Sequence, residues 1–200
     1  MIMRGSKSII LASSSPRRQE LIAILGLPFT VIPSEADEST PLDWTPQRTV
    51  EELAARKARH VYESLSTGQD AIIVGSDTVV VLDDVILGKP KNQDEAFSMI
   101  MSLQGRDHEV YTGIACFDIG SGHMKISSRM TRVTMKSLSK SEGLAYVRSG
   151  EGLDKAGAYG IQGLGATLIH SIQGDYFNVV GLPLSLLADM LGEFGLQVLQ

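Results

Sequence analysis

Two short apolar runs, separated by four small or polar residues, stand out in the hydrophobic pattern. Residues 71–74 (AIIV) and 79–82 (VVVL) are each typical of a buried β-strand, and Gly75-Ser76-Asp77-Thr78 lies between them. A carboxylate in such a run needs cations, a metal ion or the rim of a cleft, because burying it without partners is costly. A turn between two strands is the alternative interpretation, since Gly, Ser and Asp favour turns.

A strand, a tight polar turn and a helix are predicted near the N-terminus. Residues 8–12 are mainly apolar, and Ser15-Pro16 supplies a helix cap followed by a proline suited to the first helical position. Free amides and the helix dipole make such a turn an anion site. Arg17 and Arg18 are unfavourable in a first turn unless an anion neutralises them. We therefore predict phosphate binding here, with Ser13 in the turn; an exposed basic turn is the alternative.

A long amphipathic helix is predicted from Thr45-Pro46 to about Leu65. Lys57 falls on its inward stripe, where it either extends along its stem to solvent or pairs with a buried anion. The loop before this helix is acidic, and such loops are usually just solvated. Its acidic members are Glu35, Asp37 and Glu38, and one of them could bind a metal ion if it lay near Asp77.

Three more helices have recognisable beginnings. Asn92 with Glu95 and Ser139 with Glu142 are capping pairs, and Pro183 begins the last helix.

Lys89 immediately precedes Pro90. The proline keeps the lysine out of helical geometry and presents its side chain from an extended segment.

Two β-hairpins are predicted from runs of strand-forming residues. Their strands are residues 108–117 with 123–135, and residues 167–172 with 176–180. The turns are Gly120-Ser121-Gly122 and Gln173-Gly174-Asp175. His108 and His123 are expected on solvent faces.

The segment at residues 150–165, GEGLDKAGAYGIQGLG, contains six glycines. Neither a strand nor a helix tolerates so many, but a loop that approaches a ligand closely can use them. It carries Asp154, Lys155, Tyr159 and Gln162. A flexible linker is the alternative, although the segment lacks the Ser-rich, polar character of linkers.

The composition of the chain argues against several classes of protein. Two hundred residues are enough for one large domain or two closely joined lobes. The net charge of -5 argues against non-specific nucleic-acid binding. Cys116 is the only cysteine, so no disulfide framework or Cys-based zinc site is expected. No apolar run suggests a signal peptide or a membrane span, and we expect a cytoplasmic protein without membrane partners.

A single ligand could explain why four cations and one acid occupy unusual positions in the sequence. Arg17, Arg18, Lys57 and Lys89 could bind the oxygens of a polyphosphate, while Asp77 could hold an accompanying divalent metal ion or orient water for attack at phosphorus.

Four segments together resemble the Maf family. They are LASSSPRRQEL at residues 11–21, GSDTVVVLDDVILGKP at 75–90, DKAGAYGIQGLG at 154–165 and VVGLPL at 179–184. The resemblance covers nearly the whole chain in the family's order. It implies an α/β fold with an elongated mixed sheet, flanking helices and two lobes around a central cleft, as in ITPase-like proteins. It further implies a single Maf-like domain over residues 1–200, commonly in a homodimer.

The resemblance also implies an activity, that of a nucleoside triphosphate pyrophosphatase using Mg²⁺ or Mn²⁺. Asp77, the aspartate of the SDT motif, would be the catalytic base and would hold the metal with Glu38. Arg17, Thr78 and Gln162 match positions that influence substrate choice. The remaining expected substrate-binding residues are Ser13, Arg18, Lys57 and Lys89.

The base is expected to be a pyrimidine. The amide of Gln162 has a donor and an acceptor and can pair with the mixed edge of uracil or thymine. The IQG form of its motif resembles the Maf branch that acts on dTTP and UTP, so we expect these and 5-modified uridine triphosphates to be preferred to ATP and GTP. A regulatory or nucleic-acid-binding protein of cell division, and a phosphatase releasing orthophosphate, are the alternatives.

Overall fold

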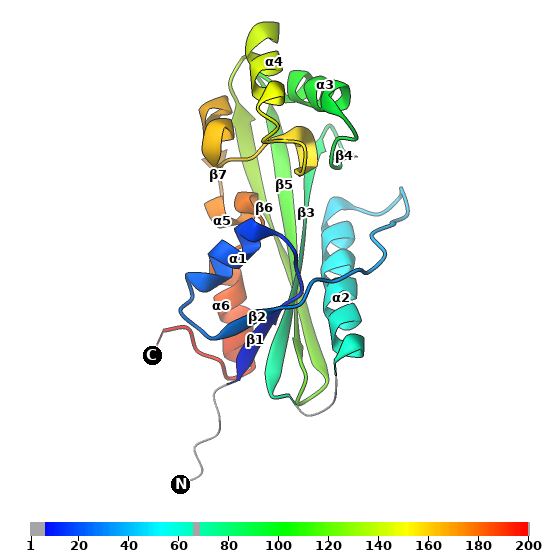
Figure 1. Ribbon diagram of the computed structural model, residues 1–200, viewed down its shortest axis with the longest axis vertical. Coiled ribbons are helices and arrows are strands. Elements are labelled where there is room, and N and C mark those ends of the chain that lie inside the picture. Colours follow the sequence, from blue (N-terminus) through cyan, green and yellow to red (C-terminus); the bar gives the residue numbers. More distant parts are fainter. Residues whose placement is uncertain (1–6, 66–68, 200) are drawn as a thin grey trace. The chain divides into compact units, whose positions relative to one another are not determined.

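The computed structural model describes residues 7–65 and 69–199, which form an α/β fold (Figure 1). Its seven-stranded mixed sheet has the order β2-β1-β3-β5-β6-β7, with β4 paired to β3. The strands are β1 (Ser8–Leu11), β2 (Phe29–Val31), β3 (Ala71–Leu82), β4 (Val85–Leu87), β5 (Asp107–Asp118), β6 (His123–Met135) and β7 (Ile169–Gln173). The α-helices are α1 (Pro16–Ala23), α2 (Pro46–Ser64), α3 (Gln93–Leu103), α4 (Lys140–Arg148), α5 (Tyr176–Val180) and α6 (Leu184–Glu193), and the 3-10 helices are η1 (Ala156–Ala158) and η2 (Gly163–Leu168).

The chain divides into two compact units. The first comprises residues 1–77, 112–128 and 181–200, and the second comprises residues 78–111 and 129–180. In the first unit β1 pairs in parallel with β2 and β3; in the second, β3 pairs with β4 and β6 with β7, both antiparallel. The single domain over residues 1–200 stays a prediction.

Helix α2 packs closely on β3 in the first unit. Ala54 and Ala58 belong to a buried apolar cluster that also contains Ile73 of β3. The approach requires a glycine in the strand, because a Cβ atom on Gly75 would lie 2.2 Å from the carbonyl oxygen of Ala54. Side chains alternate along a strand, so Gly75 and Asp77 share the face toward α2. The glycine therefore brings this helix close to the strand that carries Asp77.

The strand β3 is continuous through Asp77. Its 12 residues run from Ala71 to Leu82 without interruption, so the interpretation of residues 75–78 as a turn between two strands is wrong. Asp77 is half-buried within the strand. The turn comes later, at Asp83 and Asp84, where both residues have positive φ.

The second unit has its own apolar core. It is made by residues of β3, α3, β5, β6, α4 and the glycine-rich segment, including Val80, Ile100, Val110, Tyr146 and Tyr159. The glycine-rich segment is thus not a flexible linker: it forms η1 and η2, and Ala158 and Tyr159 are buried.

Two predictions for the second unit are wrong. Residues 176–180 form helix α5, because the Asp175 carboxylate accepts the amides of Phe177 and Asn178 at 2.8 and 3.3 Å and so caps a helix. His108 is only 3% exposed, and its Nε2 lies 2.6 Å from the hydroxyl of Tyr159. His123, in contrast, is exposed as expected.

The helix caps are confirmed. The side chains of Ser15, Thr45, Asn92 and Ser139 each accept a backbone amide at the start of a helix, and Ser139 with Glu142 forms a complete capping box. Within residues 7–65 and 69–199, no helix combines the length and apolar character that a membrane span requires.

Candidate active site

The turn before α1 is held by its own serines. The hydroxyl of Ser13, which is buried, accepts the amide of Ser15 at 3.2 Å, and the hydroxyl of Ser15 accepts the amide of Arg18 at 3.5 Å. Pro16 occupies the first position of the helix. This is the predicted strand, turn and helix N-terminus, a geometry that favours anions.

Arg18 turns back from α1 to the segment before α6. Its Nε donates to the carbonyl oxygen of Gly181 at 2.8 Å, and the hydroxyl of Ser76 donates to the same oxygen at 3.0 Å. Ser76 follows Gly75 in β3 and therefore faces away from α2. One carbonyl thus connects the first helix to the central strand of the site.

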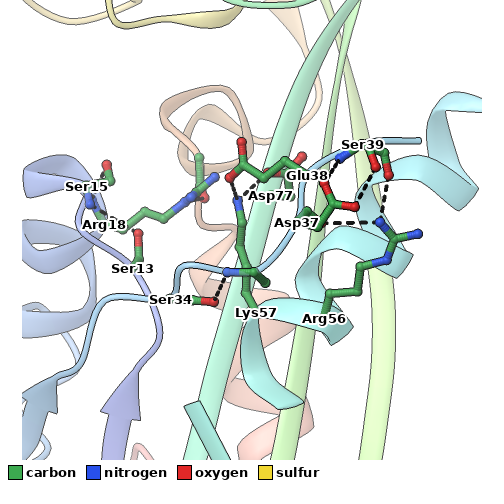
Figure 2. Close-up of polar contacts among 12 residues, drawn as sticks. Ser13, Ser15, Arg18, Ser34, Asp37, Glu38, Ser39, Arg56, Lys57 and Asp77 are labelled. Atoms are coloured by element: carbon green, nitrogen blue, oxygen red, sulfur yellow. Dashed lines mark hydrogen bonds and ion pairs between the residues drawn. The ribbon is translucent and has the colours of Figure 1, made fainter. Parts of the chain in front are cut away.

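The charges around Arg18 identify its neighbours. Burial lowers the pKa of the Arg18 guanidinium, Asp77 acts in the opposite direction, Arg17 lowers the pKa further and Glu38 raises it. Figure 2 shows the side chain of Arg18 extending from α1 in the direction of Asp77. An arginine that is partly desolvated among two acids and a second arginine is a strong anion ligand when a phosphate enters.

Lys57 joins two carboxylates. Its Nζ lies 2.7 Å from Oδ1 of Asp77 and 2.8 Å from Oε1 of Glu38, and its side chain is only 11% exposed (Figure 2). The lysine therefore pairs with an anion and does not extend to solvent, which decides between the two interpretations of its place on the inward stripe. Asp77 is 13% exposed and Glu38 is 58% exposed, so solvent reaches the cluster from the Glu38 side.

The loop carrying Glu38 is fastened to α2 by Arg56. Its Nη1 donates to the carbonyl oxygens of Asp37 and Ser39, at 3.3 and 2.7 Å, on either side of Glu38 (Figure 2). The Asp37 carboxylate accepts the amide and hydroxyl of Ser39, and these bonds lower its pKa. Of the acids in this loop, Glu38 is the one that reaches Lys57, while Asp37 turns back on its own chain.

The cluster suits a divalent metal ion bound together with phosphate. Asp77 and Glu38 already share one cation, the ammonium of Lys57, so both can direct oxygens to a common point. Mg²⁺ typically binds one or two carboxylates and completes its shell with substrate phosphates and water. Among the described residues, no three His, Cys, Asp or Glu side chains gather as a metal site. The two carboxylates therefore fit a metal whose other ligands come from a substrate.

Residues 8–194 match the family described as Maf-like protein. The chain belongs to the Maf family. A relative from Pelotomaculum thermopropionicum named dTTP/UTP pyrophosphatase is 50% identical over 96% of this chain and 100% of its own length. Another of the same name from Desulforamulus reducens is 47% identical over 96% of this chain and 99% of its own length.

The Maf fold of this chain is also similar to a solved structure, that of the Staphylococcus aureus Ham1 protein. The TM-score is 0.57 with 15% sequence identity, and the match covers 94% of this chain and 100% of the other. At this identity the similarity supports the fold alone. It confirms the mixed α/β architecture expected from the sequence.

The Maf motifs are distributed over both units. The first unit contains Ser13, Arg17, Arg18, Glu38, Lys57 and Asp77. Arg18, Glu38, Lys57 and Asp77 interact with one another there, as the ion pairs and the pKa of Arg18 indicate. The second unit contains half-buried Thr78, exposed Lys89 and half-buried Gln162. The roles of these three stay predictions based on the Maf motifs.

Sequence reasoning missed three contributors to the site. Arg56 had no signal of its own, because an arginine on the outer side of an amphipathic helix is usual. Ser76 lies within the SDT motif and Gly181 within VVGLPL, so both motifs were visible, but the bond that joins them spans 105 residues. Only the folded chain identifies these residues as partners.

Proposed function

We propose that this Maf protein is a nucleoside triphosphate pyrophosphatase that hydrolyses dTTP and UTP to the monophosphate and pyrophosphate. The observation that carries the proposal is the cluster of Asp77, Lys57 and Glu38 beside Arg18 and the N-terminus of α1. It combines a candidate base with cations that can bind phosphate. The full-length similarity to relatives named dTTP/UTP pyrophosphatase supports the same activity.

In the proposed reaction, water attacks the α-phosphorus, and the bond from this phosphorus to the oxygen bridging to the β-phosphorus breaks. Asp77 accepts a proton from the attacking water, and pyrophosphate leaves with the bridging oxygen. Asp77 suits this role because Lys57 holds its carboxylate in place while 13% of its side chain stays exposed. Lys57 also keeps a positive charge next to the phosphates as negative charge develops on them.

The other residues bind and orient the triphosphate. Arg18 and the amides before α1 would hold phosphate oxygens, as would Arg17, Ser13 and Lys89. A divalent metal ion held by Asp77 and Glu38 would neutralise the charge of the phosphate oxygens and polarise their bonds to phosphorus. Thr78 and Gln162 would contribute to the choice of base, with Gln162 pairing to the edge of uracil or thymine.

The test is a panel of dTTP, UTP, GTP, 7-methyl-GTP and ATP with Mg²⁺ or Mn²⁺, with products identified by chromatography. We expect monophosphate and pyrophosphate from dTTP and UTP, with kcat/KM well above that on the purines. Orthophosphate and diphosphate as products would overturn the proposed bond cleavage. Equal efficiency on GTP would overturn the proposed base preference alone.

The variant Asp77→Asn shows whether the measured activity belongs to this protein or to a contaminating enzyme. Removal of a general base should lower kcat by roughly 100-fold or more while the protein stays folded. The matched control is Asp70→Asn, which alters an exposed acid just before β3. Near-normal turnover by folded Asp77→Asn would remove Asp77 from the role of base.

A further inference from the structure

The part of the glycine-rich segment around Gln162 is held by one carboxylate, that of Glu151. Its Oε2 accepts the amide of Leu164 at 2.8 Å, and its Oε1 accepts the amide of Gly165 at 2.8 Å. The hydroxyl of Tyr146 donates to the same Oε1 at 3.2 Å. Both carboxylate oxygens are therefore used to fix the chain just after Gln162.

Tyr146 fixes the chain before Gln162. Its hydroxyl accepts the amide of Gly160 at 3.2 Å while it donates to Glu151. A carboxylate and a phenol thus form one hydrogen-bonded unit that reaches the backbone on both sides of Gln162. All of these residues belong to the second unit.

The segment also closes tightly on itself. A Cβ atom on Gly163 would lie 2.5 Å from Oε2 of Glu151, and one on Gly165 would lie 1.9 Å from the carbonyl oxygen of Gly160. Gly163 in addition has a φ of +61°, which other residues rarely adopt. The glycines are thus required for the backbone to reach Glu151, and the segment has little freedom to shift.

We propose that Glu151 is a positioning residue that sets base selectivity through Gln162. This rests on the proposed function, in which the amide of Gln162 pairs with the base. A side chain that selects a base by hydrogen bonds must be held in one place, because a looser group can adapt to the wrong partner. Glu151 does not touch the base in this proposal; it fixes the backbone from which Gln162 projects.

The charge of Glu151 is essential to this role. Three donors converge on its two oxygens, and bonds from an amide to a carboxylate are stronger than bonds between neutral groups. A glutamine of the same size offers a single oxygen, and its NH2 group would face one of the backbone amides, a donor against a donor. Glu151→Gln therefore releases one side of the segment without changing side-chain volume.

The experiment measures kcat/KM of Glu151→Gln on dTTP and on GTP. We expect the ratio of the two values to fall about tenfold or more, mainly through a higher KM for dTTP, because a misplaced Gln162 costs binding of the correct base. Tyr146→Phe should lower the ratio in the same direction. The matched control is Glu142→Gln, which alters a carboxylate bonded to Ser139 in the cap of α4 and should leave the ratio unchanged.

A double variant separates positioning from simple structural damage. Gln162→Ala should lower the ratio by itself, and adding Glu151→Gln to it should change the ratio little further, since both act through the same side chain. An unchanged ratio in Glu151→Gln overturns the proposal. So does an equal loss on every substrate that accompanies a lower melting temperature.

Nucleotide binding tests the role of Glu151 independently of hydrolysis. The α,β-methylene analogues of dTTP and GTP are bound to wild-type protein and to Glu151→Gln, and the ratio of their Kd values is measured by calorimetry. Absence of pyrophosphate release by wild-type protein would refute the proposed function only. An equal Kd ratio in wild type and Glu151→Gln would refute the positioning role.

Discussion

Lys57 is the residue that lets two carboxylates stand close together. Asp77 is largely buried, and Glu38 approaches the same ammonium from a loop. Lys57, whose side chain is only 11% exposed, therefore differs from an exposed cation, whose removal changes stability little. Removing a partner from a buried pair leaves an uncompensated charge.

We predict that Lys57→Ala lowers the free energy of unfolding by about 1–3 kcal/mol, less than for a fully buried pair because Glu38 is exposed. Adding Asp77→Asn should restore part of this loss, since it removes the unpaired charge. Denaturant unfolding of the two single variants and the double variant measures the effect. Lys89→Ala, at an exposed lysine, is the control and should be neutral.

His108 is a buried histidine that favours unfolding in acid, because its ring is protonated more readily in the unfolded chain than in the folded protein. Burial lowers its pKa to about 4 against the opposite influence of Asp107, whereas the usual value is 6.5. The folded protein therefore keeps this ring neutral, while the unfolded chain takes up a proton below pH 6.5. The contribution of the neutral His108 ring to stability is fully present above pH 6.5 and is lost as the pH falls toward 4.

The predicted loss from His108 reaches about 3 kcal/mol by pH 4, from the difference between the two pKa values. His108→Gln should remove this component, so its melting temperature should fall less steeply with acid than that of wild type. His123→Gln alters an exposed histidine and should follow the wild-type curve. Parallel curves for wild type and His108→Gln would contradict the assignment.

The close contact of helix α2 with the sheet determines whether Lys57 reaches Asp77. Two glycines permit it: a Cβ on Gly75 would meet Ala54 at 2.2 Å, and one on Gly113 of β5 would meet Val50 at 2.3 Å. In both cases the obstructing atom is a backbone oxygen of the helix. Such an atom cannot move aside without the helix moving with it.

We predict that Gly75→Ala destabilises the protein by about 1–3 kcal/mol through overpacking. It should also lower kcat on dTTP, because α2 carries Lys57 away from Asp77 when it shifts. The control is Gly88→Ala, since a Cβ on Gly88 meets nothing within 4 Å. Unfolding and steady-state kinetics of both variants check the prediction, which fails if Gly75→Ala behaves like Gly88→Ala.

The protein as a whole is acidic, yet its proposed substrate is a highly charged anion. The net charge is -5, so attraction must come from local cations and from a metal ion. The described residues supply two carboxylates near Lys57 and no cluster of three metal ligands. Metal and nucleotide should therefore bind cooperatively.

We predict that Mg²⁺ binds weakly alone and strengthens binding of α,β-methylene-dTTP by about 5- to 150-fold, the usual range of such coupling. Calorimetry with Mg²⁺ and with EDTA measures it. Glu38→Gln should reduce the coupling, and Glu35→Gln, in the same acidic loop, should not. Tight Mg²⁺ binding without nucleotide would show that the metal does not depend on substrate ligands.

Elements with local signals could be predicted from the order of residues along the chain. The caps at Ser15, Thr45, Asn92 and Ser139 each join residues three positions apart. Both residues of each bond therefore lie within one short stretch of sequence. The motifs around Arg18, Asp77 and Gln162 likewise indicated the family and the candidate chemistry.

Contacts between residues far apart in the sequence could not be predicted, because folding brings those residues together. Lys57 and Asp77 are 20 residues apart, and Ser76 and Gly181 are 105 apart. Residues 176–180 have strand-like side chains, yet they form helix α5, in which the buried Asn178 donates to the distant Val110 and Thr131. Local propensity is weak compared with the cost of leaving buried polar groups unpaired, and only the folded chain supplies those partners.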